Sequence, residues 1–183
     1  MAIGEILNSN HERYAISGGA AMLLLGSERE TGDVDVYIPR GEKRRIQRLL
    51  SSHDQRFALH GPRMHFAARK HSGKKGGVVQ AIVDKIKKKP APGATVLVPL
   101  DFGERPLSEI ETYSARGVNI LHPVAQIKTK CEIDRHEKDR EDVTFLAKWM
   151  LRNGFATTRK EIPQCYKYST TQRALRLAGA YHP

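Results

Sequence analysis

The chain has 183 residues and a formal net charge of +11, with 39% hydrophobic and 28% charged residues. Its length suits one compact domain, or one domain with a small appendage, and its apolar content suffices for a core. No apolar run approaches the ~18 residues of a membrane-spanning helix, and the first residues do not resemble a signal peptide. We therefore expect a cytoplasmic protein with no membrane partner. Cys131 and Cys165 lack a zinc-like spacing and are expected to be buried or free thiols.

Helices and strands alternate in the first part of the chain. Residues 3–7 predict a short amphipathic helix, and residues 13–17 predict a strand that stops at a double glycine. A helix is expected over residues 19–26, closed by its last glycine. Residues 33–38 alternate between apolar and polar side chains and predict a strand, and residues 42–52 predict an amphipathic helix.

Further strands are expected before the pattern changes to helix. Residues 56–60 and 64–70 predict a hairpin around a Gly-Pro pair, and residues 78–86 and 95–100 predict two more strands. A short strand over residues 116–122 ends at Pro123. Helices are then expected in residues 123–135, 137–153 and 170–180, with Gly154 as the stop of the second.

This order of elements predicts an α/β (α+β) fold with a small mixed β-sheet flanked by helices. Residues 1–122 form the expected α/β core, and residues 123–183 form a helical C-terminal region packed on that core.

Two carboxylates on one strand suggest a cation site. Asp33 and Asp35 are separated by one residue, so their side chains project from the same face of the predicted strand. Two such charges repel each other unless they are solvated, protonated or bridged by a cation. Oxygen-only ligands suit Mg²⁺, which is held in proteins by one or two carboxylates plus substrate phosphates. A solvated surface strand is the alternative interpretation of the same pair.

A glycine turn precedes these carboxylates. Gly18 and Gly19 lie between a predicted strand and a predicted helix, and Ser17 adds a hydroxyl at the same turn. Glycine lets the backbone approach a phosphate closely, and a strand-to-helix turn presents free N–H groups. A phosphate cradle followed by a two-carboxylate strand suits a nucleoside triphosphate with Mg²⁺, whereas a tight turn without a ligand is the plainer interpretation.

The stretch ISGGAAMLLLGSERETGDVDVYI resembles the opening signature of the nucleotidyltransferase superfamily, whose fold is that of DNA polymerase beta. It is similar to the minimal nucleotidyltransferases, which include lincosamide-type antibiotic nucleotidyltransferases and nucleotidyltransferase-like toxins of bacterial type IV toxin–antitoxin pairs. In that family a glycine turn opens a helix, and a glycine, a basic residue and a threonine precede D-x-D. The matching positions are Gly18, Gly19, Gly26, Arg29, Thr31, Asp33 and Asp35.

The family has a third carboxylate on a neighbouring strand, often in a V-D or I-D pair. The stretch VVQAIVDKI offers Asp84, which the resemblance assigns as third metal ligand or general base. Asp101, in VPLDFGERP, is the rival candidate. We favour Asp84, although basic rather than apolar residues follow it.

A looser resemblance extends into the C-terminal region. The family has a His-Pro pair followed by a helix with a lysine, an arginine and a K-D…D stretch. The corresponding residues are Lys128 or Lys130, Arg135, Lys138, Asp139 and Asp142. The resemblance implies that one of the two α-helical lysines at 128 and 130 reaches the triphosphate. The alternative is a salt-bridged helix pair, in which Lys138 pairs with Asp142 one turn away.

The resemblance thus implies a Mg²⁺-dependent nucleotidyltransferase, with Mn²⁺ as an alternative ion. A nucleoside monophosphate would pass from a nucleoside triphosphate, with ATP as the family default, to a hydroxyl acceptor, with release of pyrophosphate. Asp33, Asp35 and Asp84 are the expected catalytic and metal-binding residues, and the expected nucleotide-binding residues are Ser17, Gly18, Gly19, Arg29, Thr31, Lys128 and Lys130. RNA, a small molecule and a protein all remain open as the acceptor.

Basic clusters at residues 40–48, 69–77 and 84–90 favour an anionic partner such as a nucleotide or RNA. Two other hypotheses fit the same charge. One is a catalytically inactive member of the fold that binds nucleotide or RNA, and the other is a basic nucleic-acid module unrelated to transferases.

Overall fold

The computed structural model of the chain describes the backbone of residues 2–28, 31–69, 94–133, 137–155, 157–158 and 181–182, and the side chains of residues 2–28, 31–68, 94–131 and 139–155. The chain divides into two compact units, Met1–Leu121 and His122–Pro183. The first unit has a mixed β-sheet with helices, and the described part of the second is mostly helical, so the expected α+β class is confirmed.

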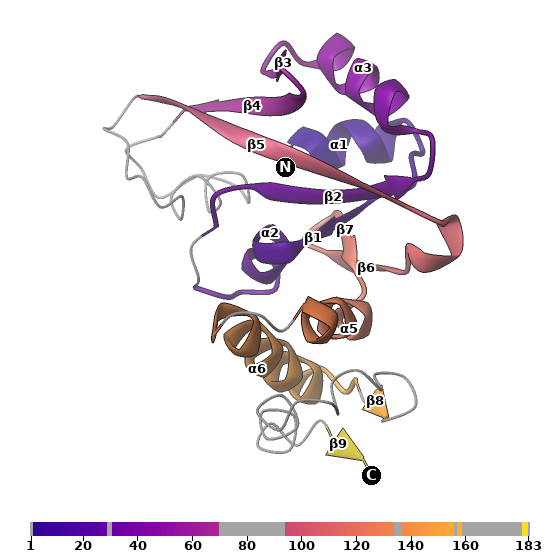
Figure 1. The fold of residues 1–183 in the computed structure, drawn as a ribbon, viewed down its shortest axis with the longest axis vertical. Coiled ribbons are helices and arrows are strands. Elements are labelled where there is room, and N and C mark those ends of the chain that lie inside the picture. The colour runs from indigo at the N-terminus through magenta and orange to yellow at the C-terminus, as the bar shows by residue number, and fades with distance from the viewer. Residues whose placement is uncertain are drawn as a thin grey trace. The chain divides into compact units, whose positions relative to one another are not determined.

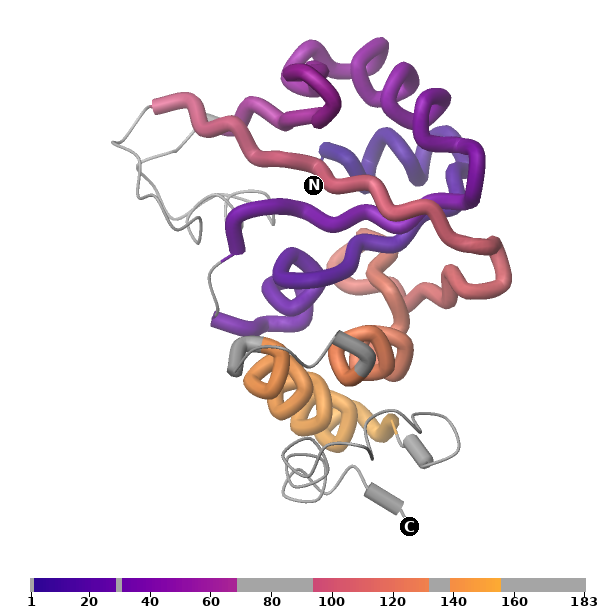
Figure 2. The backbone as a smooth tube through the Cα atoms, in the orientation of Figure 1, coloured from indigo at the N-terminus to yellow at the C-terminus, as the bar shows by residue number. Residues whose placement is uncertain are grey.

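A mixed seven-stranded sheet organises the first unit (Figures 1 and 2). Its strands follow the spatial order β3-β4-β5-β2-β1-β7-β6. β2 pairs in parallel with β5, and β1 in parallel with β7, while the other neighbours are antiparallel. The strands are β1 (Ala15–Ser17), β2 (Val34–Pro39), β3 (Phe57–His60), β4 (Arg63–Arg69), β5 (Thr95–Arg105), β6 (Thr112–Ala115) and β7 (Val118–Leu121).

The described helices of the first unit are α1 (Ala2–Ser9), α2 (Gly18–Leu24) and α3 (Lys43–His53), with a short 3₁₀ turn, η1 (Leu107–Glu109). Their apolar residues join those of the strands in one core. Ile46 and Leu50 of α3 are fully buried, as the amphipathic pattern predicts. Val36 and Ile38 of β2 are fully buried as well, which confirms the alternation expected for this strand.

Two strands differ from the sequence-based prediction. β5 extends to Arg105, well beyond the expected residue 100, and has Pro99 inside it. Pro99 is paired with His65 of β4, and the pairing of β5 with β2 begins only at Leu100, so Pro99 has a neighbouring strand on one side only, as is usual for proline in a sheet. β6 was not predicted. It pairs with β7 through a turn at Arg116 and Gly117, which both have positive φ, as a type I′ hairpin turn requires.

The predicted strand over residues 78–86 lies outside the described residues. The predicted helix over residues 170–180 lies outside them as well.

The second unit has α5 (Pro123–Ile133) and α6 (Glu137–Arg152), together with two short paired strands, β8 (Thr157–Thr158) and β9 (Tyr181–His182). The expected apolar stripe of α6 is buried, and α6 ends just before Gly154, whose φ is +73°. Cys131 is disulfide-bonded, so the expectation of a free thiol is wrong at this position. Within the described ranges, no helix is long and apolar enough to cross a membrane.

Candidate functional site

Asp35 lies on the face of β2 that does not enter the core, and Asp33 directly precedes this strand. Val34 and Val36 point into the core, and the alternation of the strand therefore turns Asp35 and Tyr37 the other way, where both side chains are partly exposed. Asp33 is also partly exposed. We call the side of the sheet that carries Asp35 and Tyr37, together with the adjoining Asp33, the Asp35 face.

The glycine turn lies directly against the second of these carboxylates. β1 pairs with β2 so that Ser17 is opposite Asp35, and Gly18 then begins α2 with a φ of +60°. A Cβ atom added to Gly18 would lie only 1.9 Å from Oδ2 of Asp35. Only glycine fits here, because its backbone must pass closely beside the carboxylate. Gly19 and Ser17 are both buried, and the Ser17 hydroxyl makes no capping hydrogen bond to α2.

Thr31 holds the first carboxylate in place. Its side chain is 2% exposed, and its hydroxyl lies 3.2 Å from the backbone oxygen of Asp33 and 3.3 Å from Oδ1 of the same residue. The hydroxyl can donate to either oxygen, so Thr31 orients the Asp33 side chain. Sequence reasoning assigned Thr31 to nucleotide binding and did not foresee this contact. Arg29, assigned to the same role, lies outside the described residues.

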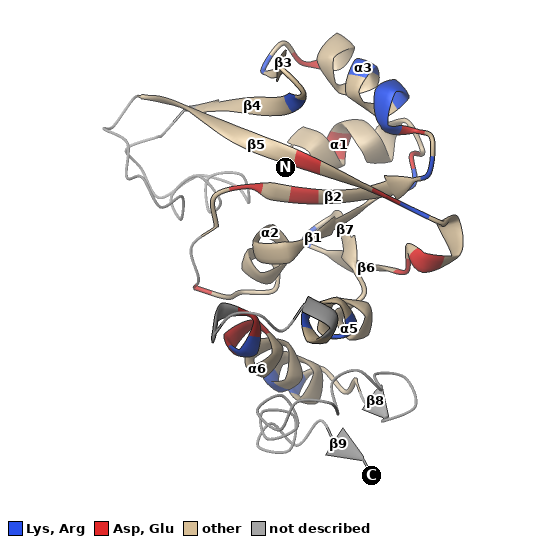
Figure 3. Ribbon diagram, in the orientation of Figure 1, with Lys and Arg blue, Asp and Glu red and all other residues tan. Residues whose placement is uncertain are grey.

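A third carboxylate on the neighbouring strand belongs to Asp101. In the parallel pairing of β2 with β5, Asp101 is the direct partner of Asp35. Paired residues in adjacent strands project from the same face, about 5 Å apart in backbone position. Figure 3 shows acidic positions side by side on these two strands. Nε of Arg63 lies 3.6 Å from Oδ1 of Asp101. The structure therefore places the rival candidate beside Asp35, whereas Asp84 lies outside the described residues.

An aromatic ring lies next to the carboxylates. Tyr37 lies over Gly103 of β5, where an added Cβ would lie 2.7 Å from two ring carbons. The guanidinium carbon of Arg105 is 5.1 Å from the ring centroid, a cation–π distance. Sequence reasoning missed this group, although a glycine inside a strand is a recognised sign of close approach by a neighbouring group.

The two lysines assigned to nucleotide binding lie in the second unit and differ in environment. Lys128 is exposed on α5. Lys130 is mostly buried, and its Nζ lies 3.0 Å from Oδ1 of Asp139 and 2.9 Å from Oδ2 of Asp142. Burial would lower the pKa of Lys130, but the hydrogen bonds and charges of Asp142 and Asp139 outweigh it and raise the pKa above its ordinary value of 10.5. Asp142 thus joins α6 to α5; the side chain of Lys138 and all of Arg135 lie outside the described residues.

The donor chemistry of the Asp35 face suits a hard divalent ion. It combines carboxylate oxygens on neighbouring strands with a backbone turn that only glycine can form. In the parts of the chain that the structure describes, however, no group of three or more His, Cys, Asp or Glu residues is arranged to hold a metal ion. The described residues alone therefore offer a partial ligand set, which substrate phosphates or further residues would have to complete.

Comparison with known proteins establishes the fold and nothing finer. No family model matches the chain, and no curated protein matches it. A solved structure, that of JHP933 from Helicobacter pylori, superposes with a TM-score of 0.56 at 16% sequence identity, covering 97% of this chain and 74% of JHP933. At this identity the similarity concerns the path of the backbone.

Proposed function

We propose that the chain is a Mg²⁺-dependent nucleotidyltransferase of the DNA polymerase beta-like fold, with a nucleoside triphosphate, ATP in the first instance, as donor. The observation that supports this most is the position of Asp35. Its carboxylate touches the backbone of Gly18 on one side, and its strand neighbour on the other side is Asp101. A carboxylate pair directly beside a glycine turn places cation ligands and phosphate-binding N–H groups together.

Each described residue of the face has a role in this proposal. Asp33, oriented by Thr31, and Asp35 would hold Mg²⁺ or Mn²⁺, and the turn formed by Ser17, Gly18 and Gly19 would bind phosphate oxygens. When bound, the ion supplies charge neutralisation at the leaving pyrophosphate. Asp101 or Asp84 would accept the proton of the attacking hydroxyl. Arg29 would stabilise negative charge. A contact of Lys128 or Lys130 with the triphosphate stays a prediction from the resemblance alone.

The test is incubation of the protein with each labelled nucleoside triphosphate and Mg²⁺ in a cell extract. Transfer would place the label in RNA, protein or a small molecule, which identifies the acceptor class and the nucleotide together. If the label stays in the triphosphate for every nucleotide tested, the proposed transferase activity is contradicted.

Asparagine at position 33 or 35 is expected to lower pyrophosphate release by about 100-fold or more, because each substitution removes one anionic ligand without changing side-chain volume. Glu111→Gln, at an exposed residue away from the face, is the matched loss of one negative charge and should leave the rate unchanged. Equal rates for Asp35→Asn and Glu111→Gln would remove the metal from the proposal.

The third carboxylate is decided by comparing Asp101→Asn with Asp84→Asn in the same assay. Because Asp101 is paired with Asp35 in the sheet, we expect its substitution to cost at least ten times more activity than that at Asp84. A larger loss of activity in Asp84→Asn than in Asp101→Asn would make Asp84 the third carboxylate, which is the assignment that the sequence favoured.

The second candidate function is that of an inactive member of the fold that binds nucleotide or RNA, which the net charge of +11 fits equally well. That protein would bind triphosphate or RNA but release no pyrophosphate with any acceptor. A cytoplasmic location also stays a prediction.

A further inference from the structure

The apolar face of helix α3 packs into the core of the first unit. Ile46 and Leu50 are fully buried in the core of the first unit, and Gln47 between them is 9% exposed. The remaining positions of the helix are polar or charged, apart from Leu49, which packs against the core. The outer face of α3 therefore has no free apolar surface of its own.

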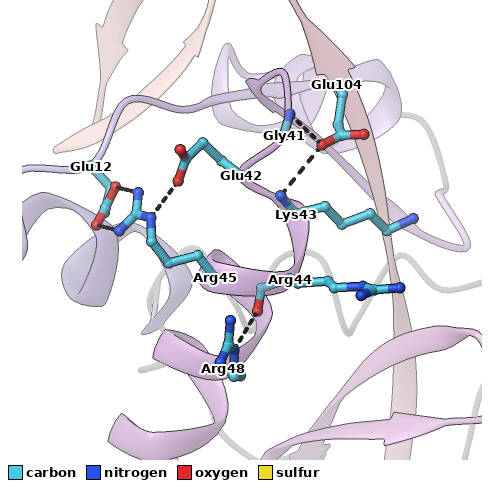
Figure 4. A network of polar contacts seen from close by, with 8 residues as sticks. All are labelled: Glu12, Gly41, Glu42, Lys43, Arg44, Arg45, Arg48 and Glu104. Atoms are coloured by element: carbon cyan, nitrogen blue, oxygen red, sulfur yellow. Dashed lines mark hydrogen bonds and ion pairs between the residues drawn. The ribbon is translucent and has the colours of Figure 1, made fainter.

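The carboxylates around the start of α3 are all engaged. Oε1 of Glu104 accepts hydrogen bonds from the backbone N–H groups of Gly41, at 2.8 Å, and Lys43, at 3.4 Å. The guanidinium of Arg45 forms a two-pronged ion pair with Glu12 and a further one with Glu42 (Figure 4). The hydrogen bonds from Arg45 hold the pKa of Glu12 below its usual value, so Glu12 stays charged and committed to Arg45.

Four cations just before α3 and in its first two turns have no such partner. Within the described part of the chain, Arg40, Lys43, Arg44 and Arg48 form no ion pair with any acidic residue. We call these four residues the α3 cations. In Figure 4 the side chains of Lys43 and Arg44 extend to one side, away from Arg45 and its two carboxylates. Nε of Arg48 bonds the backbone oxygen of Arg44, 3.3 Å away, one turn earlier in the helix. The network around Arg45 thus leaves a group of unneutralised cations on the surface.

We propose that the α3 cations form a docking surface for the phosphate backbone of a nucleic acid. Lys and Arg that neutralise successive phosphates release counterions, and this supplies affinity without sequence preference. A strongly positive chain, at +11, adds long-range attraction for such a polyanion. An anionic membrane is the poorer partner, because membrane-surface helices insert an apolar face, and that of α3 is buried in the core.

This proposal does not depend on transferase activity, since none of the α3 cations belongs to the Asp35 face. RNA binding is therefore measured in EDTA, without divalent ions, so that the result does not depend on whether the Asp35 face binds a metal ion.

The test is fluorescence anisotropy with a short labelled single-stranded RNA, a duplex RNA of the same sequence, and vesicles of anionic phospholipid in parallel. We expect Arg40→Gln/Arg44→Gln/Arg48→Gln to weaken RNA binding at least tenfold at low salt. The plot of log affinity against log salt has a negative slope, and its magnitude should decrease by about 2, because each lost single-strand phosphate contact accounts for about 0.7. Arg40→Lys/Arg44→Lys/Arg48→Lys keeps the three positive charges and should retain RNA binding.

The matched control is Arg13→Gln/Lys148→Gln/Arg152→Gln, which removes the same three charges from other exposed positions. It should change the affinity no more than about twofold to threefold, which is what a loss of net charge alone would cause. Equal losses in the two triple variants would overturn a dedicated surface on α3. Binding to anionic vesicles in preference to both RNA probes would overturn the choice of partner.

Discussion

Alanine at position 18 is expected to abolish divalent-dependent binding of a nucleoside triphosphate. Its Cβ would lie 1.9 Å from Oδ2 of Asp35, so the carboxylate or the turn must move. The φ of +60° adds the strain of a left-handed conformation, about 1–3 kcal/mol for a residue with a side chain. Calorimetric titration with Mg²⁺ and a non-hydrolysable triphosphate analogue measures the first effect, and urea unfolding measures the second.

Gly61→Ala provides a matched control for Gly18→Ala. Gly61 has a φ of +63°, and nothing lies within 4 Å of a Cβ added there. It shares the backbone strain but not the collision with Asp35. We expect Gly61→Ala to lower stability and leave triphosphate binding intact. Similar triphosphate affinities for the two variants would show that the contact between Gly18 and Asp35 has no part in binding.

Methionine at position 130 is expected to destabilise the second unit by about 3 kcal/mol. Lys130 lies between two carboxylates whose side chains are 11% and 3% exposed, those of Asp139 and Asp142. Removing one partner of a buried ion pair costs about 3–5 kcal/mol, and the lower end applies because Lys130 keeps 16% exposure. Trp149 is the single tryptophan of the chain and belongs to α6, so its fluorescence follows unfolding of this unit.

The pH dependence of this variant has a definite sign. In the unmodified protein the pKa of Lys130 is raised above 10.5, so its contribution is complete below about pH 10.5 and is lost as the pH rises through the folded-state pKa. Lys130→Met lacks this contribution at every pH. The stability difference between the two proteins should therefore shrink as the pH rises through the folded-state pKa of Lys130. Lys148→Met, at an exposed position of α6, should show neither effect.

Local pattern predicted much of the fold. The alternation of residues 33–38 gave the correct buried face of β2, and the spacing of Ile46 and Leu50 gave that of α3. Helix stops at Gly26 and Gly154 were also predictable, because both have the positive φ that favours glycine. β6 has no such pattern. One of its residues, Ala115, is buried, and the strand forms because a tight turn at Arg116 and Gly117 folds it back on β7.

Contacts between segments far apart in sequence could not be predicted. The choice of Asp84 over Asp101 rested on a short motif, whereas the partner of Asp35 depends on the register between β2 and β5. In the same way, periodicity within α6 suggested a pair between Lys138 and Asp142. The structure pairs Asp142 with Lys130 of α5, which only the packing of two helices determines, while the side chain of Lys138 lies outside the described residues. The only sign in the sequence that Gly18 lies close to Asp35 is the double glycine that precedes the D-x-D motif.

The most direct test of the metal site is a Mn²⁺ titration followed by electron paramagnetic resonance, with and without a non-hydrolysable triphosphate analogue. The protein should remove free Mn²⁺ from solution, more tightly when the analogue is present, because phosphate oxygens complete the ligand set. Asp35→Asn should lose this binding while Glu111→Gln keeps it. Free Mn²⁺ that is unchanged by the protein, or bound equally by Asp35→Asn, would contradict a divalent ion held beside Gly18.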